Sequence, residues 1–255
     1  MKRNMTSLAV AAALALAQIN PVSAEALCAL EKAASTQETA EPAPKSTGSG
    51  IKPESADGTD FLKSLNGTYI ELFTGRTCLN PKFDGLWKDE AAKFIDEKQA
   101  EAAVKQLIGA CQGTRTGESA AEYFERHGGM QFCCAFLQGV EKFAFRGNRI
   151  AGYDSRGKRV FSHKYRFVEK DANGSYIFES CERQEDEFRY FWFRPDTPSE
   201  TYHIEFRYGD DKRQLAQLME GKYAYWMASG VRDGHEEEWQ KSIILFVEEN
   251  LGAEQ

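Results

Sequence analysis

His203 and Glu205 are the two residues whose types and spacing best suit binding chemistry. They lie within residues 188–209, where aromatic and polar residues alternate as they do in β-strands. Side chains two apart on a strand project from the same face, roughly 7 Å from each other. A metal ion bound at about 2.0–2.2 Å from each donor atom could lie between them. The alternative, which is commoner for this pattern, is a polar strand face turned to water.

Catalytic motifs are scarce in the rest of the chain. The sequence has no Gly-x-Ser-x-Gly, His-Glu-x-x-His, Walker or dinucleotide-binding motif. The adjacent Cys133 and Cys134 offer the best enzymatic alternative, as a redox-active pair. Neighbouring residues on a strand point to opposite faces, however, so adjacent cysteines more often find different partners. The sequence therefore predicts a protein that is not an enzyme.

Residues 1–24 have the pattern of a secretory signal peptide. Lys2 and Arg3 precede an apolar run at residues 8–17, and the small residues before Glu25 fit a cleavage site after Ala24. The apolar run is too short to span a membrane, so we expect an exported protein with no membrane span. Because the chain is expected to be exported, its even number of cysteines predicts disulfides, whose pairing the sequence leaves open. The cysteines are Cys28, Cys78, Cys111, Cys133, Cys134 and Cys181.

The predicted mature chain is acidic and begins with a polar segment. Removing the signal leaves 30 basic and 39 acidic residues, a net charge of about −9, which disfavours nucleic acids and anionic membranes as partners. From Ala33 to Asp60 the chain is rich in Ala, Ser, Thr, Pro, Gly and Glu, with Ile51 as the only large apolar residue. Such a segment buries too little surface to offset its ordering entropy. We therefore expect a disordered linker at residues 25–60 and one folded domain at 61–255.

The folded part reads as a series of strands with helices on either side. Apolar residues recur at helical spacing in four segments: 86–111, 118–126, 211–220 and 235–251. Strand patterns occupy 65–72, 149–154, 158–169, 175–182 and the two halves of 188–209. Residues 131–146 form one further strand or two that are joined near Gly139. Turns such as Asn173-Gly174 connect these strands, so we expect an antiparallel up-and-down sheet that closes on itself. The aromatic group at 223–227 is expected to plug a barrel end or to form a packing patch.

Several stretches between Val140 and Val231 resemble the ZinT (YodA) family in order and spacing. They are Tyr176–Cys181, Tyr190–Arg194 with Pro198, His203-Ile204-Glu205 with Gly209-Asp210-Asp211, and Gln214–Glu220 with Tyr223–Trp226. Near the start of the folded part, Gly67-Thr68-Tyr69 resembles a variant of the Gly-x-Trp that opens calycin barrels. The resemblance implies a mainly β fold, an antiparallel lipocalin-like (calycin) barrel with N-terminal and C-terminal helices. It also implies a periplasmic location, with zinc and the binding protein of a zinc importer as partners.

The ligand positions of the family are only partly kept in this chain. The family places one His at the end of a strand and a His-x-His on the next, where this sequence has Arg194 and His203-Ile204-Glu205. An arginine cannot ligate zinc, and its charge repels a cation. Arg194 could instead form a salt bridge with Glu205, which is the alternative to a zinc site. The resemblance implies His203 and Glu205 as zinc ligands, with a further ligand open among His127, His163 and Glu179.

The sequence thus predicts an exported, non-catalytic zinc-binding protein that serves periplasmic zinc binding or delivery through an altered metal site. The alternative is a calycin barrel that has lost its metal. Its interior, with Arg194 and Arg207 near aromatic side chains, would then hold a small anionic or amphipathic ligand.

Overall fold

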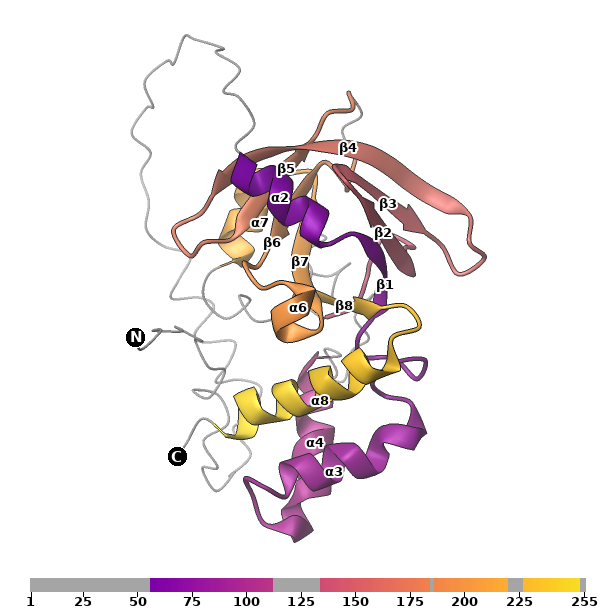
Figure 1. The fold of residues 1–255 in the computed structure, drawn as a ribbon, viewed down its shortest axis with the longest axis vertical. Coiled ribbons are helices and arrows are strands. Elements are labelled where there is room, and N and C mark those ends of the chain that lie inside the picture. The colour runs from indigo at the N-terminus through magenta and orange to yellow at the C-terminus, as the bar shows by residue number, and fades with distance from the viewer. Residues whose placement is uncertain (1–55, 112–133, 184–185, 220–226, 253–255) are drawn as a thin grey trace, which may run out of the picture. The chain divides into compact units, whose positions relative to one another are not determined.

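The computed structural model describes residues 56–111, 134–183, 186–219 and 227–252, which form a closed antiparallel barrel with flanking helices (Figure 1). Each strand pairs with the next one along the chain, and the last pairs with the first. The predicted up-and-down, calycin-like barrel is therefore confirmed. Its strands are β1 (Gly67–Glu71), β2 (Lys142–Arg146), β3 (Arg149–Tyr153), β4 (Arg159–Lys170), β5 (Tyr176–Ser180), β6 (Tyr190–Phe193), β7 (Ile204–Gly209) and β8 (Ala228–Arg232).

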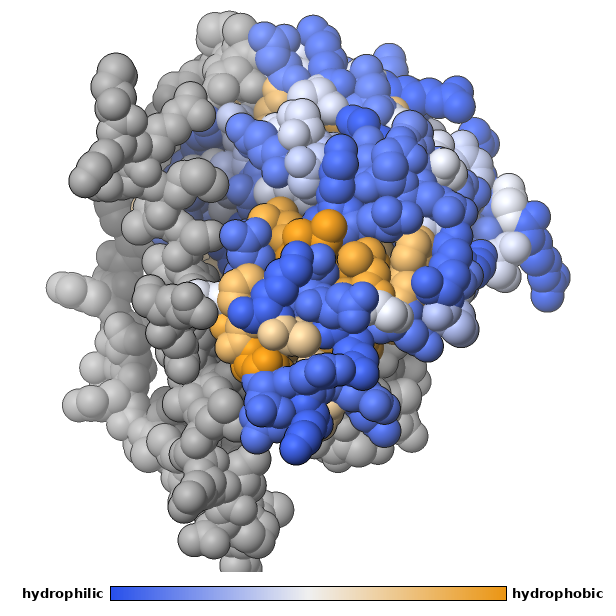
Figure 2. Space-filling view, turned by 60° about the horizontal axis from the view of Figure 1, so that its bottom comes forward, coloured by the Kyte–Doolittle hydropathy of each residue, from blue (hydrophilic) through white to orange (hydrophobic). Residues whose placement is uncertain are grey.

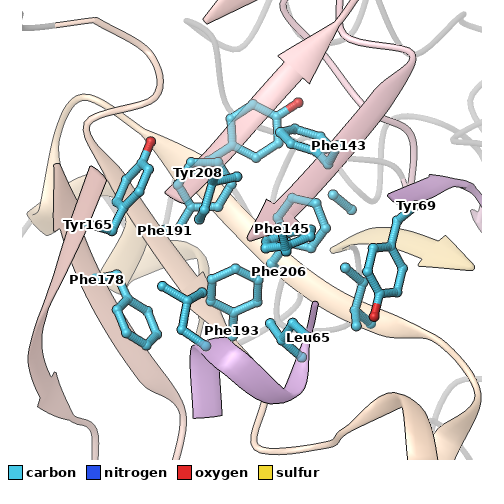
Figure 3. Packing of buried hydrophobic residues seen from close by; sticks show 14 of the residues in the cluster. Leu65, Tyr69, Phe143, Phe145, Tyr165, Phe178, Phe191, Phe193, Phe206 and Tyr208 are labelled. Atoms are coloured by element: carbon cyan, nitrogen blue, oxygen red, sulfur yellow. The ribbon is translucent and has the colours of Figure 1, made fainter. Parts of the chain in front are cut away.

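Aromatic side chains fill the barrel interior, as the alternating sequence pattern requires (Figure 3). Phe143 lies among them, and its ring centroid is 5.1 Å from that of Phe206 and 5.4 Å from that of Tyr208. Phe161 stacks on Phe188 with centroids 3.9 Å apart. Edge-to-face and stacked rings at these separations attract each other beyond the area that they bury. The interior is therefore a packed core.

The first described helix, α2 (Ala56–Ser64), packs against the barrel core. Its Phe61 stacks on Tyr176 with ring centroids 3.8 Å apart. A Cβ on Gly58 would lie 2.1 Å from the ring of Phe167, so this close approach requires glycine. The expected linker ran to residue 60, but α2 begins at Ala56, and the last five residues of that segment are helical. Residues 1–24 and 25–55 lie outside the described part of the chain.

Helices on the outer surface of the barrel contribute to two apolar clusters. One cluster joins α3 (Asp84–Ala91), α4 (Glu97–Cys111) and α8 (Glu236–Leu251) to β1 and β8. The other joins α7 (Lys212–Leu218) to β5 and β6. Figure 2 turns the α3, α4 and α8 side toward the viewer and shows hydrophobic residues bordered by hydrophilic ones. None of the described helices is long and apolar enough to cross a membrane. Two shorter helical elements are η2 (Pro81–Phe83) and α6 (Pro198–Thr201).

Two predicted elements differ in the structure. Of the strand expected at 131–146, only Lys142–Arg146 is extended, and the chain before it is irregular from residue 134, with a left-handed backbone at Gln138 and Gly139. Residues 131–133 and the helix expected at 118–126 lie outside the described residues. The irregular segment still places Phe136 and Val140 in the barrel core. The pattern was therefore right about burial and about the strand at 142–146, whereas the described residues before it, 134–141, are not extended.

The closing strand β8 was missed by the sequence reasoning. It begins with Ala228-Ser229-Gly230, small residues that have weak strand propensity. A Cβ on Gly230 would lie 3.0 Å from the ring of Phe136 and 3.3 Å from Cβ of Tyr69, so packing favours glycine here. Of the aromatic group at 223–227, the structure describes Met227, which belongs to the apolar cluster of α7.

Candidate metal centre

The predicted ligands lie on the outer surface of the barrel wall. Ile204, Phe206 and Tyr208 belong to the interior core, so the residues that alternate with them on β7, Glu205 and Arg207, face outward. Glu205 pairs in register with Ser229 of β8, and Arg207 with Trp192 of β6. The polar side chains of β7 therefore lie outside the aromatic core. The alternative of an anionic or amphipathic ligand held by Arg207 in the interior is wrong about where this arginine points.

A tight turn before β7 positions the imidazole of His203. Helix α6 starts at Pro198, whose fixed φ suits the first turn, and the chain leaves it at Tyr202 with φ 63°. Thr201 then forms two hydrogen bonds with His203. Its backbone oxygen lies 2.7 Å from Nδ1 of His203, and its hydroxyl donates to the His203 carbonyl at 2.9 Å. Because a carbonyl can only accept, Nδ1 carries the proton and Nε2 is the atom available to a ligand partner.

The available nitrogen lies close to the neighbouring carboxylate. Nε2 of His203 is 3.7 Å from Oε1 of Glu205. Two ligands of a tetrahedral zinc ion, with bonds of about 2.0–2.2 Å, are roughly 3.3–3.6 Å apart. The His203 side chain is 13 % exposed and that of Glu205 is 30 % exposed, so both side chains are partly buried and solvent still reaches them. The spacing thus suits two ligands of one metal ion.

Two arginines lie near the same carboxylate. Nε of Arg194 is 4.0 Å from Oε2 of Glu205 and donates to Sδ of Met227 at 3.3 Å. The ion pair considered as the alternative to a zinc site is thus present, and Glu205 is shared between His203 and Arg194. Arg207 is fully buried, and burial lowers the pKa of its guanidinium to about 10, which leaves it charged at neutral pH.

These charges also shift the pKa values of the two candidate ligands. Burial by itself would raise the pKa of Glu205, but the charges of His203, Arg194 and Arg207 hold it below its ordinary value. Burial would lower the pKa of His203, but Glu205 and the Thr201 carbonyl raise it above its ordinary value. The pair therefore exists as a carboxylate beside an imidazole that gains a proton readily.

The other histidines and acids proposed as ligands lie elsewhere or outside the described residues. His163 is buried in the barrel, with Nε2 3.3 Å from Asp186. Glu179 forms ion pairs with Arg166 and Arg189 on the outside of β5 and β6. His127 belongs to the undescribed segment 112–133. Neither His163 nor Glu179 is brought to His203.

Two acidic residues that the sequence reasoning missed are electrostatically coupled to the pair. They are Asp196, in the turn after β6, and Glu249, near the end of α8. Asp196 could have been noticed, because it follows Arg194 by two residues. Glu249 carries no sequence signal, because it is far along the chain and only the packing of α8 brings it near. Within the described ranges, no three His, Cys, Asp or Glu side chains converge closely enough to hold a metal ion.

Cys78, Cys111 and Cys134 are thiols in the structure, and none of these three is joined to another by a disulfide. Cys78 is buried, and burial raises the pKa of its thiol to about 12. Among its described residues, the structure does not show the predicted disulfides, which stay a prediction. The suggested pair of Cys133 with Cys134 includes a residue outside the described segments.

Comparison with known proteins finds similarity among solved structures. No protein-family model and no curated protein matches the chain. The Zn(II)-bound ZinT-like domain of AdcA from Streptococcus pneumoniae is 15 % identical, covers 72 % of this chain and 89 % of that one, and has a TM-score of 0.43. Zn(II)-bound AdcA of the same organism is 14 % identical, with a TM-score of 0.42 over 87 % of this chain and 44 % of that one. The chain thus spans less than half the length of AdcA.

Proposed function

We propose that this chain is a non-catalytic zinc-binding protein of the ZinT type, with an altered site in which His203 and Glu205 are the protein ligands. The observation that carries the proposal is the separation of 3.7 Å between Nε2 of His203 and Oε1 of Glu205. The anchored Nδ1 adds to it, since a hydrogen bond on the second ring nitrogen is the usual support of a ligating histidine.

Water and a nearby acid would complete the coordination. Zinc sites with few protein ligands commonly keep solvent in the remaining positions. Asp196 and Glu249 are exposed, and both are close enough to act electrostatically on His203 and Glu205. Their charges favour a cation at this place and offset part of the repulsion from Arg194.

Arg194 is the feature that makes the site weak. Its guanidinium competes with a cation for Glu205 and repels it at short range. A single charge a few Å away changes a binding free energy by about 1–2 kcal/mol in a partly solvated site. We therefore expect micromolar affinity for zinc in the wild type, and binding about tenfold tighter when the charge is removed.

Zinc titration by calorimetry tests the proposal directly. The wild-type protein should bind zinc with a stoichiometry near one, and His203→Ala should abolish this binding. Arg194→Gln, which keeps a long polar side chain without the charge, should bind about tenfold tighter. His235→Ala is the matched control, because His235 also lies within 3.8 Å of carboxylate oxygens but belongs to the exposed start of α8.

Two results would contradict the proposal. Unchanged binding in His203→Ala would place the zinc elsewhere. Absence of binding in both the wild type and Arg194→Gln would show that the protein does not bind zinc. In the second case a small anion held at Arg194 becomes the better account, and the same titration with phosphate would detect it.

Export and delivery belong to the same proposal. They rest on the signal-like residues 1–24 and on the family resemblance, which favour a periplasmic protein that binds zinc or passes it to the binding protein of an importer. Fractionation of a bacterial host that expresses the full sequence checks this. We expect a product that begins at Glu25 in the periplasmic fraction, whereas an unprocessed cytoplasmic product would contradict export.

A further inference from the structure

Two cysteines far apart in the sequence meet beside the barrel wall. Cys111 is the last residue of α4, and Cys134 is the first described residue after the segment 112–133. The backbone N–H of Cys134 donates to the carbonyl of Cys111 at 2.9 Å, and the Cys111 thiol is close enough to act on the ionisation of the Cys134 thiol. We propose that Cys111 and Cys134 form a disulfide that fastens the end of α4 to the barrel wall.

The backbone contact places these residues within disulfide range. One backbone N–H to carbonyl bond of this length joins residues whose Cα atoms are about 5–6 Å apart, and disulfides need a Cα separation of about 4.4–6.8 Å. The effect of the Cys111 thiol on the Cys134 thiol agrees with side chains that lie near each other. The backbone positions of the two residues are therefore compatible with a disulfide.

Cys134 is also held from its other side. The backbone N–H of Ser229, on β8, donates to the carbonyl of Cys134 at 3.1 Å. Cys134 thus lies between the end of α4 and the closing strand of the barrel, and its side chain is 5 % exposed. A disulfide at this point would join a helix of the outer apolar cluster to the wall that carries Glu205.

The other described buried thiol is engaged differently. Sγ of Cys78 donates to the backbone oxygen of Trp239 at 3.4 Å, and its environment is apolar. The pairing of Cys111 with Cys134 is thus a choice among the possible pairings that the sequence alone could not make. Cys133 is outside the described residues, so the experiment must separate it from its neighbour.

The bond would form by exchange with a disulfide, such as oxidised glutathione or a disulfide-carrying oxidoreductase. Cys111 is the more exposed of the two, so its thiolate attacks a sulfur of the oxidant and expels one thiolate. Cys134 then loses its proton and attacks the mixed disulfide at the Cys111 sulfur, releasing the second thiol. Two protein thiols are oxidised and one disulfide of the oxidant is reduced to two thiols. The neighbouring Cys111 thiol and burial raise the pKa of the Cys134 thiol, which agrees with its acting second.

Peptide mapping after treatment with oxidised glutathione tests the pairing in the intact protein. Digestion without reduction should give one cross-linked product that contains Cys111 and Cys134. The link should persist in Cys133→Ser and in Cys78→Ser. Cys134→Ser should instead keep one glutathione on Cys111, because the second attack is then impossible. Cys111 linked to Cys133, or both thiols still free after treatment, would overturn the proposal.

A stability measurement provides a second, independent readout. Closing a loop of this length should raise the melting temperature by about 10 °C. Reduction should lower the melting temperature of the wild type by this amount and leave the double variant Cys111→Ser/Cys134→Ser unchanged. Equal melting temperatures of the oxidised and reduced wild type would contradict a disulfide that holds α4 in place.

Discussion

The two faces of β7 carry side chains of opposite chemistry, although they come from consecutive residues. Ile204, Phe206 and Tyr208 belong to the aromatic core, while Glu205 and Arg207 face the outside between the two apolar clusters. The inner face is held by ring packing with neighbours on every side. The side chains of the outer face interact through their charges, and Oε1 of Glu205 lies 3.7 Å from Nε2 of His203, a separation that suits two ligands of one metal ion.

Two carboxylates show what this difference means for ionisation. Glu71 lies at the end of β1 on the same strand face as Tyr69, and its Oε1 accepts from the Phe136 backbone N–H at 2.9 Å. Burial raises the pKa of Glu71 to about 7. On the outer face, His203 and the arginines lower the pKa of Glu205 instead. Cations near a carboxylate thus decide the sign of the shift when both groups are partly buried.

Truncating an interior ring should have the largest effect. Phe206→Ala removes a fully buried ring that contacts Phe143 at 5.1 Å between centroids, and we expect a loss of about 3–5 kcal/mol in unfolding free energy. The neighbouring Glu205→Ala should cost about 1 kcal/mol or less, since that side chain is partly exposed. Urea denaturation measures both. Similar losses at the two positions would show that the two faces of β7 contribute equally to the unfolding free energy.

The pH dependence of stability should reveal Glu71. Its pKa is raised in the folded state, so the native protein holds a proton that the unfolded chain releases above about pH 4.5. Stability should therefore fall as the pH rises from about 4.5 to 7, by about 2–3 kcal/mol.

Glu71→Gln is the matched control for this prediction. It keeps an acceptor for the Phe136 N–H and cannot ionise, so its unfolding free energy should not fall over this range. Denaturation at several pH values provides the measurement. A wild-type curve parallel to that of Glu71→Gln would show that folding does not raise the pKa of Glu71.

A methyl group added to the interior should have a smaller effect. In Gly152→Ala the new Cβ would lie 2.5 Å from the ring of Phe161, which cannot retreat because it stacks on Phe188. We expect a loss of about 2 kcal/mol. Gly85→Ala, in α3 with open space around it, should instead stabilise by about 0.5 kcal/mol. Thermal denaturation compares the two, and an equally tolerated Gly152→Ala would mean that the interior has spare room.

The sequence predicted the interior of this protein well, because a strand pattern depends on adjacent residues. Phe161, His163 and Tyr165 on β4 are buried, and Phe206 and Tyr208 share a face as their spacing requires. The limits of this reasoning appear where packing overrides propensity. Small residues form β8, and Phe136 is buried from an irregular segment, because the barrel must be closed and its end covered.

The sequence by itself thus determined the alternation that makes a barrel, and it singled out His203 and Glu205 as a pair. Only the tertiary structure decided that this pair faces outward, that Arg194 shares the carboxylate, and that Glu249 is close enough to act on it. The same holds for the contact of Cys111 with Cys134. These neighbours come from separate segments of the chain, and their distances depend on how helices and strands pack, which local residue patterns do not encode.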